Sequence, residues 1–133
     1  MGGQHFSLAC TLNTNGEGVK LRALADSGAN GFVFINKSRA IELAKHFNIP
    51  ISRLPFTIKV KGFDGETART PVSHLLRLNL LLNGRKFLNI PLLIIDIASH
   101  DLILSRAFFA HFKIDLAVHN RKLIWPESIP PHP

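Results

Sequence analysis

The sequence predicts one mainly β domain, and three observations support this prediction. The chain has 133 residues, of which 46% are hydrophobic, which suffices for one compact core and not for two ordinary domains. Short apolar runs flank Asn-Gly or Asp-Gly pairs at three places, and such pairs favour tight turns between antiparallel strands. Apolar residues recur at helical spacing in two shorter stretches.

Three β-hairpins are expected, each with its turn at one of these pairs. A further short strand pair is expected around Asn120, close to the end of the chain. In chain order, the expected hairpin strands are 5–12 and 18–25 around Asn15-Gly16, 57–63 and 66–72 around Asp64-Gly65, and 75–82 and 86–95 around Asn83-Gly84.

Two helices complete the expected elements. Apolar residues recur at helical spacing from Lys37 to Phe47, so this segment is assigned to core packing. Asn36 is suited to cap its start, and Pro50 closes the segment. A shorter helix is expected from Arg106 to Phe112, with Ser105 at its N-cap.

A weak internal repeat relates the two halves of the chain. Each half contains a hairpin, a corner of small residues and a helix that begins at this corner. The first corner reads Asp26-Ser27-Gly28, and the second ends the segment "DLILS" at 101–105. The Asp-Ser-Gly triplet occurs in the first corner alone.

Charge and composition argue against several kinds of partner. The net charge is +7, but Lys and Arg are scattered in runs of two at most. The chain has one Trp and no Tyr, so an aromatic platform on which nucleic-acid bases could stack is hard to build. A solvated basic surface is therefore expected, and no specific nucleic-acid partner is expected. No apolar run is long enough to span a membrane, so no membrane partner is expected.

No metal, cofactor or disulfide is expected either. The seven histidines lack metal-binding spacing. The single cysteine, Cys10, lies in an apolar segment and is expected to be a small core residue.

Asp26 is the residue that the sequence marks for chemistry. Gly28 permits a sharp turn and the close approach of another chain, and the carboxylate of Asp26 is presented rigidly at the end of a strand, where it suits general acid–base work on water. Two such carboxylates about 3 Å apart would share one proton, and a homodimer would supply the second copy. Asp96 and Asp101 also flank an apolar segment, but neither precedes Ser/Thr-Gly, so surface or capping roles are expected for them.

The segment "ALADSGANGFVFI" resembles the D-[ST]-G-[AS] active-site segment of retropepsins, the aspartic proteases of retroviruses and LTR retrotransposons. The hairpin "KVKGFDGETA" resembles their flap, and "DLILSRAFFAHFKIDLAVHNRKLIW" is similar to the corresponding segment of gypsy-class retrotransposon proteases. The resemblance covers residues 6–126 and implies a retropepsin-like acid protease fold, a closed β-barrel with one main helix and one short C-terminal helix, as a homodimer. Residues 1–5 are expected to be linker or expression-derived residues, and 127–133 a Pro-rich, extended tail.

The resemblance also implies roles for individual residues. Asp26 would be the catalytic carboxylate, and Ser27 and Gly28 would support the active-site turn. Ser105 stands where the family has glycine, and Asn30 where the viral enzymes have the aspartate that pairs with the arginine at Arg106. The substrate-contacting residues would be Gly28, Ala29, Asn30 and, in the flap tip, Gly62, Phe63, Asp64 and Gly65, and the second corner would pack through Leu104, Ser105 and Arg106.

The function expected from this resemblance is that of an aspartic endopeptidase which cleaves an extended peptide of a retroelement polyprotein. An intracellular, cytoplasmic location is expected, including the interior of retroelement particles. The first alternative is a non-catalytic retropepsin-like dimerisation or binding module, for which Ser105 is the motivating residue. A basic, nucleic-acid-binding β domain is the second.

Overall fold

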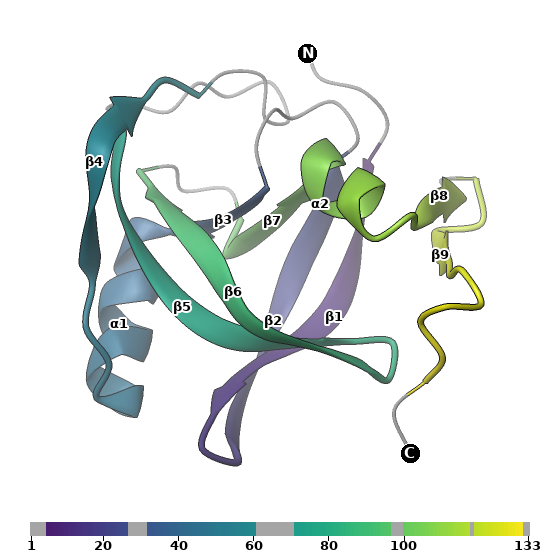
Figure 1. The fold of residues 1–133 in the computed structure, drawn as a ribbon, viewed down its shortest axis with the longest axis horizontal. Coiled ribbons are helices and arrows are strands. Elements are labelled where there is room, and N and C mark those ends of the chain that lie inside the picture. Colours follow the sequence, from purple (N-terminus) through teal and green to yellow (C-terminus); the bar gives the residue numbers. More distant parts are fainter. Residues whose placement is uncertain (1–4, 27–31, 61–70, 97–99, 118, 132–133) are drawn as a thin grey trace.

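The computed structural model describes residues 5–26, 32–60, 71–96, 100–117 and 119–131, and Figure 1 shows the arrangement of its elements. Neither helix within these ranges is long and apolar enough to cross a membrane. The elements are β1 (His5–Thr14), β2 (Glu17–Asp26), β3 (Val33–Asn36), α1 (Lys37–Phe47), β4 (Ser52–Ile58), β5 (Val72–Leu82), β6 (Arg85–Ile95), β7 (Leu102–Ser105), α2 (Arg106–His111), β8 (Asp115–Ala117) and β9 (Lys122–Ile124).

A closed barrel forms the body of the molecule (Figure 1). Its hydrogen-bonded strands follow the order β1-β2-β7-β3-β6-β5, and β1 pairs with β5 to close the ring. β4 adds to this sheet beside β5, and β8 and β9 form a separate two-stranded sheet. The predicted barrel, with one main helix and one short C-terminal helix, is confirmed.

The two halves of the chain exchange their third strands. β3 of the first half pairs in parallel with β6, and β7 of the second half pairs in parallel with β2. β3 and β7 then meet each other in antiparallel register at the centre. Two equivalent backbone hydrogen bonds hold this crossing: the Asn36 N–H donates to the Asp101 carbonyl at 2.9 Å, and the Ser105 N–H donates to the Phe32 carbonyl at 3.0 Å. The predicted internal repeat is therefore confirmed.

The Asn-Gly turns are as predicted. Asn15 and Gly16 have φ angles of 51° and 86°, and Asn83 and Gly84 have φ angles of 49° and 75°. Positive φ at both central residues is the geometry of a type I′ turn, whose twist matches that of the strands on either side. These turns fix the register of the β1–β2 and β5–β6 hairpins.

Helix α1 has the predicted bounds and cap. The Asn36 side chain accepts a hydrogen bond from the Arg39 N–H at 3.1 Å, which satisfies one of the free donors of the first turn. Asn48 ends the helix in a left-handed conformation with φ 53°, two residues before Pro50. Ala40 and Leu43 are buried, as the helical spacing predicts.

Two apolar clusters use opposite faces of the strands. Because successive strand residues point to opposite faces, Ala23 and Ala25 belong to the main cluster and Leu24 belongs to the second. The main cluster takes in the buried faces of both helices, including Leu43 and Phe108. Each fully buried large side chain contributes about 1.5–3 kcal/mol to folding.

Cys10 lies in the main cluster, as expected from the sequence. Burial raises the pKa of its thiol from the ordinary 9.0 to about 12, and the positive charge of Arg22 opposes this rise only in part. Because the thiolate is the nucleophilic form, Cys10 is unreactive near neutral pH in the folded protein.

The second hairpin differs from its predicted bounds. The strand expected over 57–63 is β4, which begins at Ser52 and ends at Ile58, and β5 begins only at Val72. β4 is mostly exposed, and only Leu54 and Ile58 are partly buried, against the second cluster. Hydrophobic alternation is therefore weak in this strand, and its pairing with β5 defines it instead. The expected tip, Asp64-Gly65, lies outside the described residues.

The Pro-rich tail is docked against the barrel up to residue 131, which the sequence did not predict. Arg85 Nε donates to the Ile129 carbonyl at 3.2 Å, and Ile129 packs against the main cluster. The Arg85 guanidinium also lies 4.4 Å from the centre of the Trp125 ring, a cation–π contact worth about 0.5–1 kcal/mol at a partly exposed site.

Candidate active site

Asp26 is the last residue of β2, and it is fully buried, with 0% of its surface exposed. β2 lies between β1 and β7, so Asp26 faces His5 across the antiparallel β1–β2 pair and Ser105 across the parallel β2–β7 pair. Burial of a carboxylate in a protein interior is costly. A buried carboxylate at a strand end is therefore a candidate for function rather than for surface solubility.

The face of β2 that carries Asp26 also carries an apolar surface. Leu24 precedes Asp26 by two residues, so both side chains project from the same face. Leu24 belongs to the second cluster, together with Phe34 of β3 and Ile103 of β7. The register places Ile103 beside Leu24 and opposite Phe34. Asp26 thus stands at the end of a continuous apolar strip made by three strands.

Ser105 is the closest neighbour of Asp26 on β7 that the sequence analysis singled out. It is 0% exposed, and its register with Asp26 shows that the ends of β2 and β7 lie side by side. The predicted N-cap position is also confirmed, but its side chain makes no cap hydrogen bond to α2. Among the described residues its hydroxyl oxygen has no hydrogen-bond partner, which is rare for a buried polar group.

Ser105→Ala is expected to raise the free energy of unfolding by about 1 kcal/mol, because it removes a buried hydroxyl whose hydrogen bond is unmade. Urea unfolding followed by circular dichroism measures the change. Ser52→Ala, on an exposed strand position, serves as the control and should shift stability by less than about 0.5 kcal/mol. A loss of stability in Ser105→Ala, larger than in the control, would mean that the hydroxyl has a partner in the folded protein.

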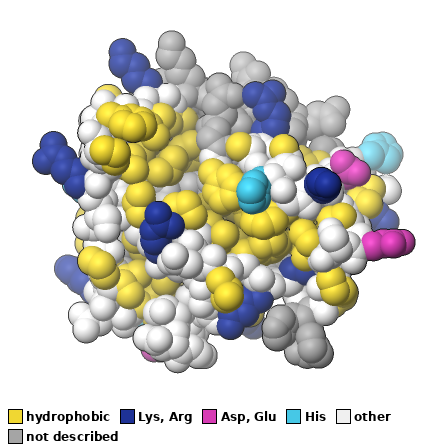
Figure 2. Space-filling model, in the orientation of Figure 1, with side chains coloured by type: hydrophobic (Ala, Val, Ile, Leu, Met, Phe, Trp, Pro, Cys, Tyr) yellow, Lys and Arg dark blue, Asp and Glu magenta, His cyan; other side chains and the backbone are white. Residues whose placement is uncertain are grey.

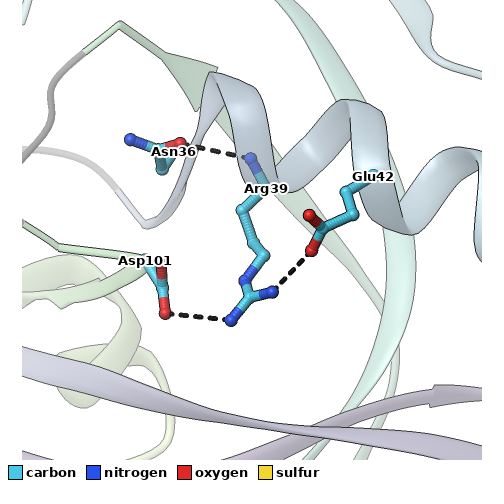
Figure 3. Close-up of polar contacts among 4 residues, drawn as sticks. All are labelled: Asn36, Arg39, Glu42 and Asp101. Carbon is cyan, nitrogen blue, oxygen red and sulfur yellow. Dashed lines mark hydrogen bonds and ion pairs between the residues drawn. The ribbon is translucent and has the colours of Figure 1, made fainter.

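The start of α1, which follows β3 as α2 follows β7, holds a polar network that includes Asp101 (Figure 3). The Arg39 guanidinium lies between Asp101 and Glu42, donating to the Asp101 carboxylate at 3.4 Å and to Glu42. The hydrogen bond to Glu42 raises the pKa of Arg39 above its ordinary value. Asp101 is part of an ion pair on a partly exposed surface. This supports the predicted surface role of Asp101.

The remaining predicted site residues fall into two groups. Leu104 is fully buried in the main cluster, and Arg106 is exposed as the first residue of α2.

No group of three His, Cys, Asp or Glu side chains within the described ranges could hold a metal ion. The predicted roles of Ser27, Gly28, Ala29, Asn30, Gly62, Phe63, Asp64 and Gly65 stay predictions, because these residues lie outside the described ranges.

A pocket with a volume of about 370 Å³, which no sequence motif marks, lies beside Asp26, because His5 in its lining is the cross-strand partner of Asp26. Its lining includes His5 and Arg22 from the β1–β2 hairpin, His100 just before β7, and Arg121 from the turn between β8 and β9. These residues come from separate segments, so no local motif joins them. The sequence indicates only that the polar residues of β1 and β2 alternate with apolar ones and therefore share one face of the hairpin.

Comparison with known proteins gives one informative result. No family model matches the chain, and no curated protein sequence matches it either. The crystal structure of the retroviral protease-like domain of Ddi1 from Leishmania major is similar, with a TM-score of 0.63 over 97% of this chain and 94% of that chain. The chain has the retropepsin-like fold. At 17% identity the likeness concerns the fold alone.

Proposed function

We propose that this protein is an aspartic endopeptidase that acts as a homodimer, with one Asp26 from each subunit in a shared site. The observation that carries the proposal is the fully buried carboxylate of Asp26 at the end of β2, in a retropepsin-like fold. One carboxylate cannot be acid and base at once. A two-fold axis at this corner brings a second copy to the first.

The chemistry follows from two neighbouring carboxylates that hold a single proton, because like charges at this distance resist joint ionisation. The ionised carboxylate accepts a proton from a water molecule while the water oxygen bonds to the peptide carbonyl carbon. The protonated carboxyl gives its proton to the carbonyl oxygen. When the carbon–nitrogen bond of this tetrahedral intermediate breaks, the amine nitrogen takes the proton that the first carboxylate received from water, and the second carboxylate takes a proton from a hydroxyl of the intermediate. A new carboxyl terminus and a new amine are released, and the pair again holds one proton.

The apolar environment of Asp26 supports a peptide as the substrate. Leu24, Phe34 and Ile103 are buried side chains on the face of β2 that carries the carboxylate, so they exclude water from this side of the site, and an extended peptide with apolar side chains suits such an environment. Under the proposal, Ser27 and Gly28 hold the active-site turn, while Ala29, Asn30 and the flap residues 62–65 contact the substrate. The substrate would be a retroelement polyprotein, and the protease one of the gypsy class.

Dimerisation must then use surfaces other than the two phenylalanines of α2. Phe108 and Phe109 of this helix are buried within the subunit, so they are engaged in the core and cannot also cover a partner. The active-site corners themselves, where β2 and β7 end, are the surfaces that a shared site requires.

The second candidate function is a non-catalytic dimerisation or binding module. The buried Ser105 hydroxyl beside Asp26 favours it, because serine stands here at the position where the family that the sequence resembles has the smaller glycine. In this case the fold and the dimer persist without peptide hydrolysis.

Incubation of the protein with a peptide library at mildly acid pH tests the proposal, with cleavage products identified by mass spectrometry. Sedimentation of the same sample gives its oligomeric state. We expect fragments from peptides with apolar residues around the cleaved bond. A sample that is dimeric in sedimentation and cleaves no peptide would contradict the enzyme and support the binding module.

A further inference from the structure

The pocket beside Asp26 lies on the same sheet face as this carboxylate. The β1–β2 register places His5 opposite Asp26, Ser7 opposite Leu24 and Ala9 opposite Arg22. Residues directly opposite each other project from one face of the sheet, as do residues two apart along a strand. The His5, Ser7, Arg22 and Leu24 side chains, all of which line the pocket, therefore share a face with Asp26.

The charge of the pocket has one sign. Two guanidinium groups, Arg22 and Arg121, and two imidazoles, His5 and His100, contribute to its lining, and no described Asp or Glu does. Arg22 donates one hydrogen bond to the Ser7 hydroxyl at 3.1 Å. A guanidinium has five N–H donors in a fixed fork, so this contact orients the Arg22 side chain and leaves donors for a ligand.

The pocket also has an apolar wall. Phe6 and Leu24 line it beside the basic groups, and both are almost fully buried. An aspartate or glutamate side chain matches such a wall with its methylene groups, and it matches the guanidinium fork with a planar carboxylate. Leu24 lines the pocket two residues before Asp26 on the same face of β2, and His5 lines it opposite Asp26, so a peptide bound at Asp26 passes close to the pocket.

We propose that this pocket binds an acidic side chain of the substrate, so that the protein prefers peptides with Asp or Glu close to the cleaved bond. The inference rests on the proposed function for its substrate, an extended peptide. A nucleic acid is the less suitable anion, because it needs a track of cations along its backbone. Figure 2 shows Lys and Arg spread over the visible face without forming such a track.

Binding and cleavage of matched peptides test the pocket. The probes are labelled apolar peptides that carry Glu, Gln or Lys at one position, moved in turn along both sides of the central residue pair. Binding is measured by fluorescence anisotropy on the Asp26→Asn dimer, which keeps the substrate intact, and kcat/KM is measured on the wild type. At the best position we expect Glu to be favoured over Gln by about tenfold in both measurements, the effect of one charge-assisted hydrogen bond.

Charge reversal supplies the decisive variants. In Arg22→Glu and Arg121→Glu, the preference for Glu should disappear and Lys should become the favoured residue. Arg53→Glu is the matched control, because Arg53 is exposed on β4 and does not line the pocket; it should keep the wild-type ratio. Circular dichroism checks that each variant is folded.

The outcomes separate the two proposals. Binding that favours Glu and depends on Arg22, in a protein that cleaves nothing, would support the pocket and overturn the endopeptidase. Cleavage with equal preference for Glu and Gln in wild type and variants would overturn the pocket alone. Tighter binding of a single-stranded oligonucleotide than of the Glu peptide, lost in Arg22→Glu, would also overturn the acidic-peptide assignment.

Discussion

Asp26→Asn is expected to lower kcat/KM for peptide hydrolysis by roughly 10³-fold or more while the protein stays folded and dimeric. The reason is that an amide cannot accept the proton of the attacking water, and general acid–base catalysis by one positioned group supplies about 10²–10⁴-fold. Asn has nearly the shape of Asp, so the packing of the fully buried position is retained.

The measurement is peptide cleavage at mildly acid pH, with sedimentation and circular dichroism on the same samples. Asp115→Asn is the matched control, because it makes the same chemical change at an exposed strand position that belongs neither to β2 or β7 nor to the pocket lining. It should retain activity within about twofold of the wild type, as surface substitutions usually do. If Asp26→Asn cleaves as fast as this control, Asp26 is not the catalytic group.

Phe108→Ala is expected to lower the free energy of unfolding by about 3–5 kcal/mol, the range for a large aromatic side chain removed from a core. Phe108 has 0% exposure, and its ring centre lies 5.4 Å from those of Phe32 and Phe87 and 5.1 Å from that of Phe112. The truncation leaves a cavity at the centre of this aromatic group. α2 begins directly after Ser105, so loss of the Phe108 side chain, which anchors this helix in the core, also loosens the end of β7 beside Asp26.

Urea unfolding measures this effect, and Phe56→Ala provides the comparison. Phe56 lies on β4 and is 69% exposed, so its truncation should change the free energy of unfolding by less than about 0.5 kcal/mol. A cost below about 1 kcal/mol for Phe108→Ala would show that the aromatic group does not form a close-packed core.

The local elements were predictable because their signals are local. Asn15-Gly16 and Asn83-Gly84 require positive φ, which a type I′ turn uses and few other residue pairs tolerate. Helix α1 has both an apolar spacing and a capping side chain at Asn36. The exchange of β3 and β7 between the halves was not predictable, because parallel pairing of distant strands leaves no mark in either segment alone. The bounds of β4 were not predicted either, because only Leu54 and Ile58 of this strand are partly buried and its hydrophobic alternation is weak.

In the candidate site, too, residues marked by a local motif were predictable and residues brought together from distant segments were not. Asp26 was found because the Asp-Ser-Gly triplet is contiguous, and Ser105 because it ends a recognisable apolar run. The Arg39–Asp101 pair and the basic pocket join residues from segments far apart in the chain. Scattered Arg and His residues gave no reason to group Arg22 with Arg121. Only the fold brings them to one pocket.

The central claim is that each active site needs Asp26 from two subunits, and mixing wild-type protein with Asp26→Asn at constant total concentration tests it most directly. After subunit exchange, a shared site predicts that activity follows the square of the wild-type fraction, because only wild-type homodimers are active. Equal parts of the two proteins should then retain about one quarter of the wild-type activity. A linear decline, to about one half at equal parts, would contradict the shared site, because it would mean that each subunit works alone.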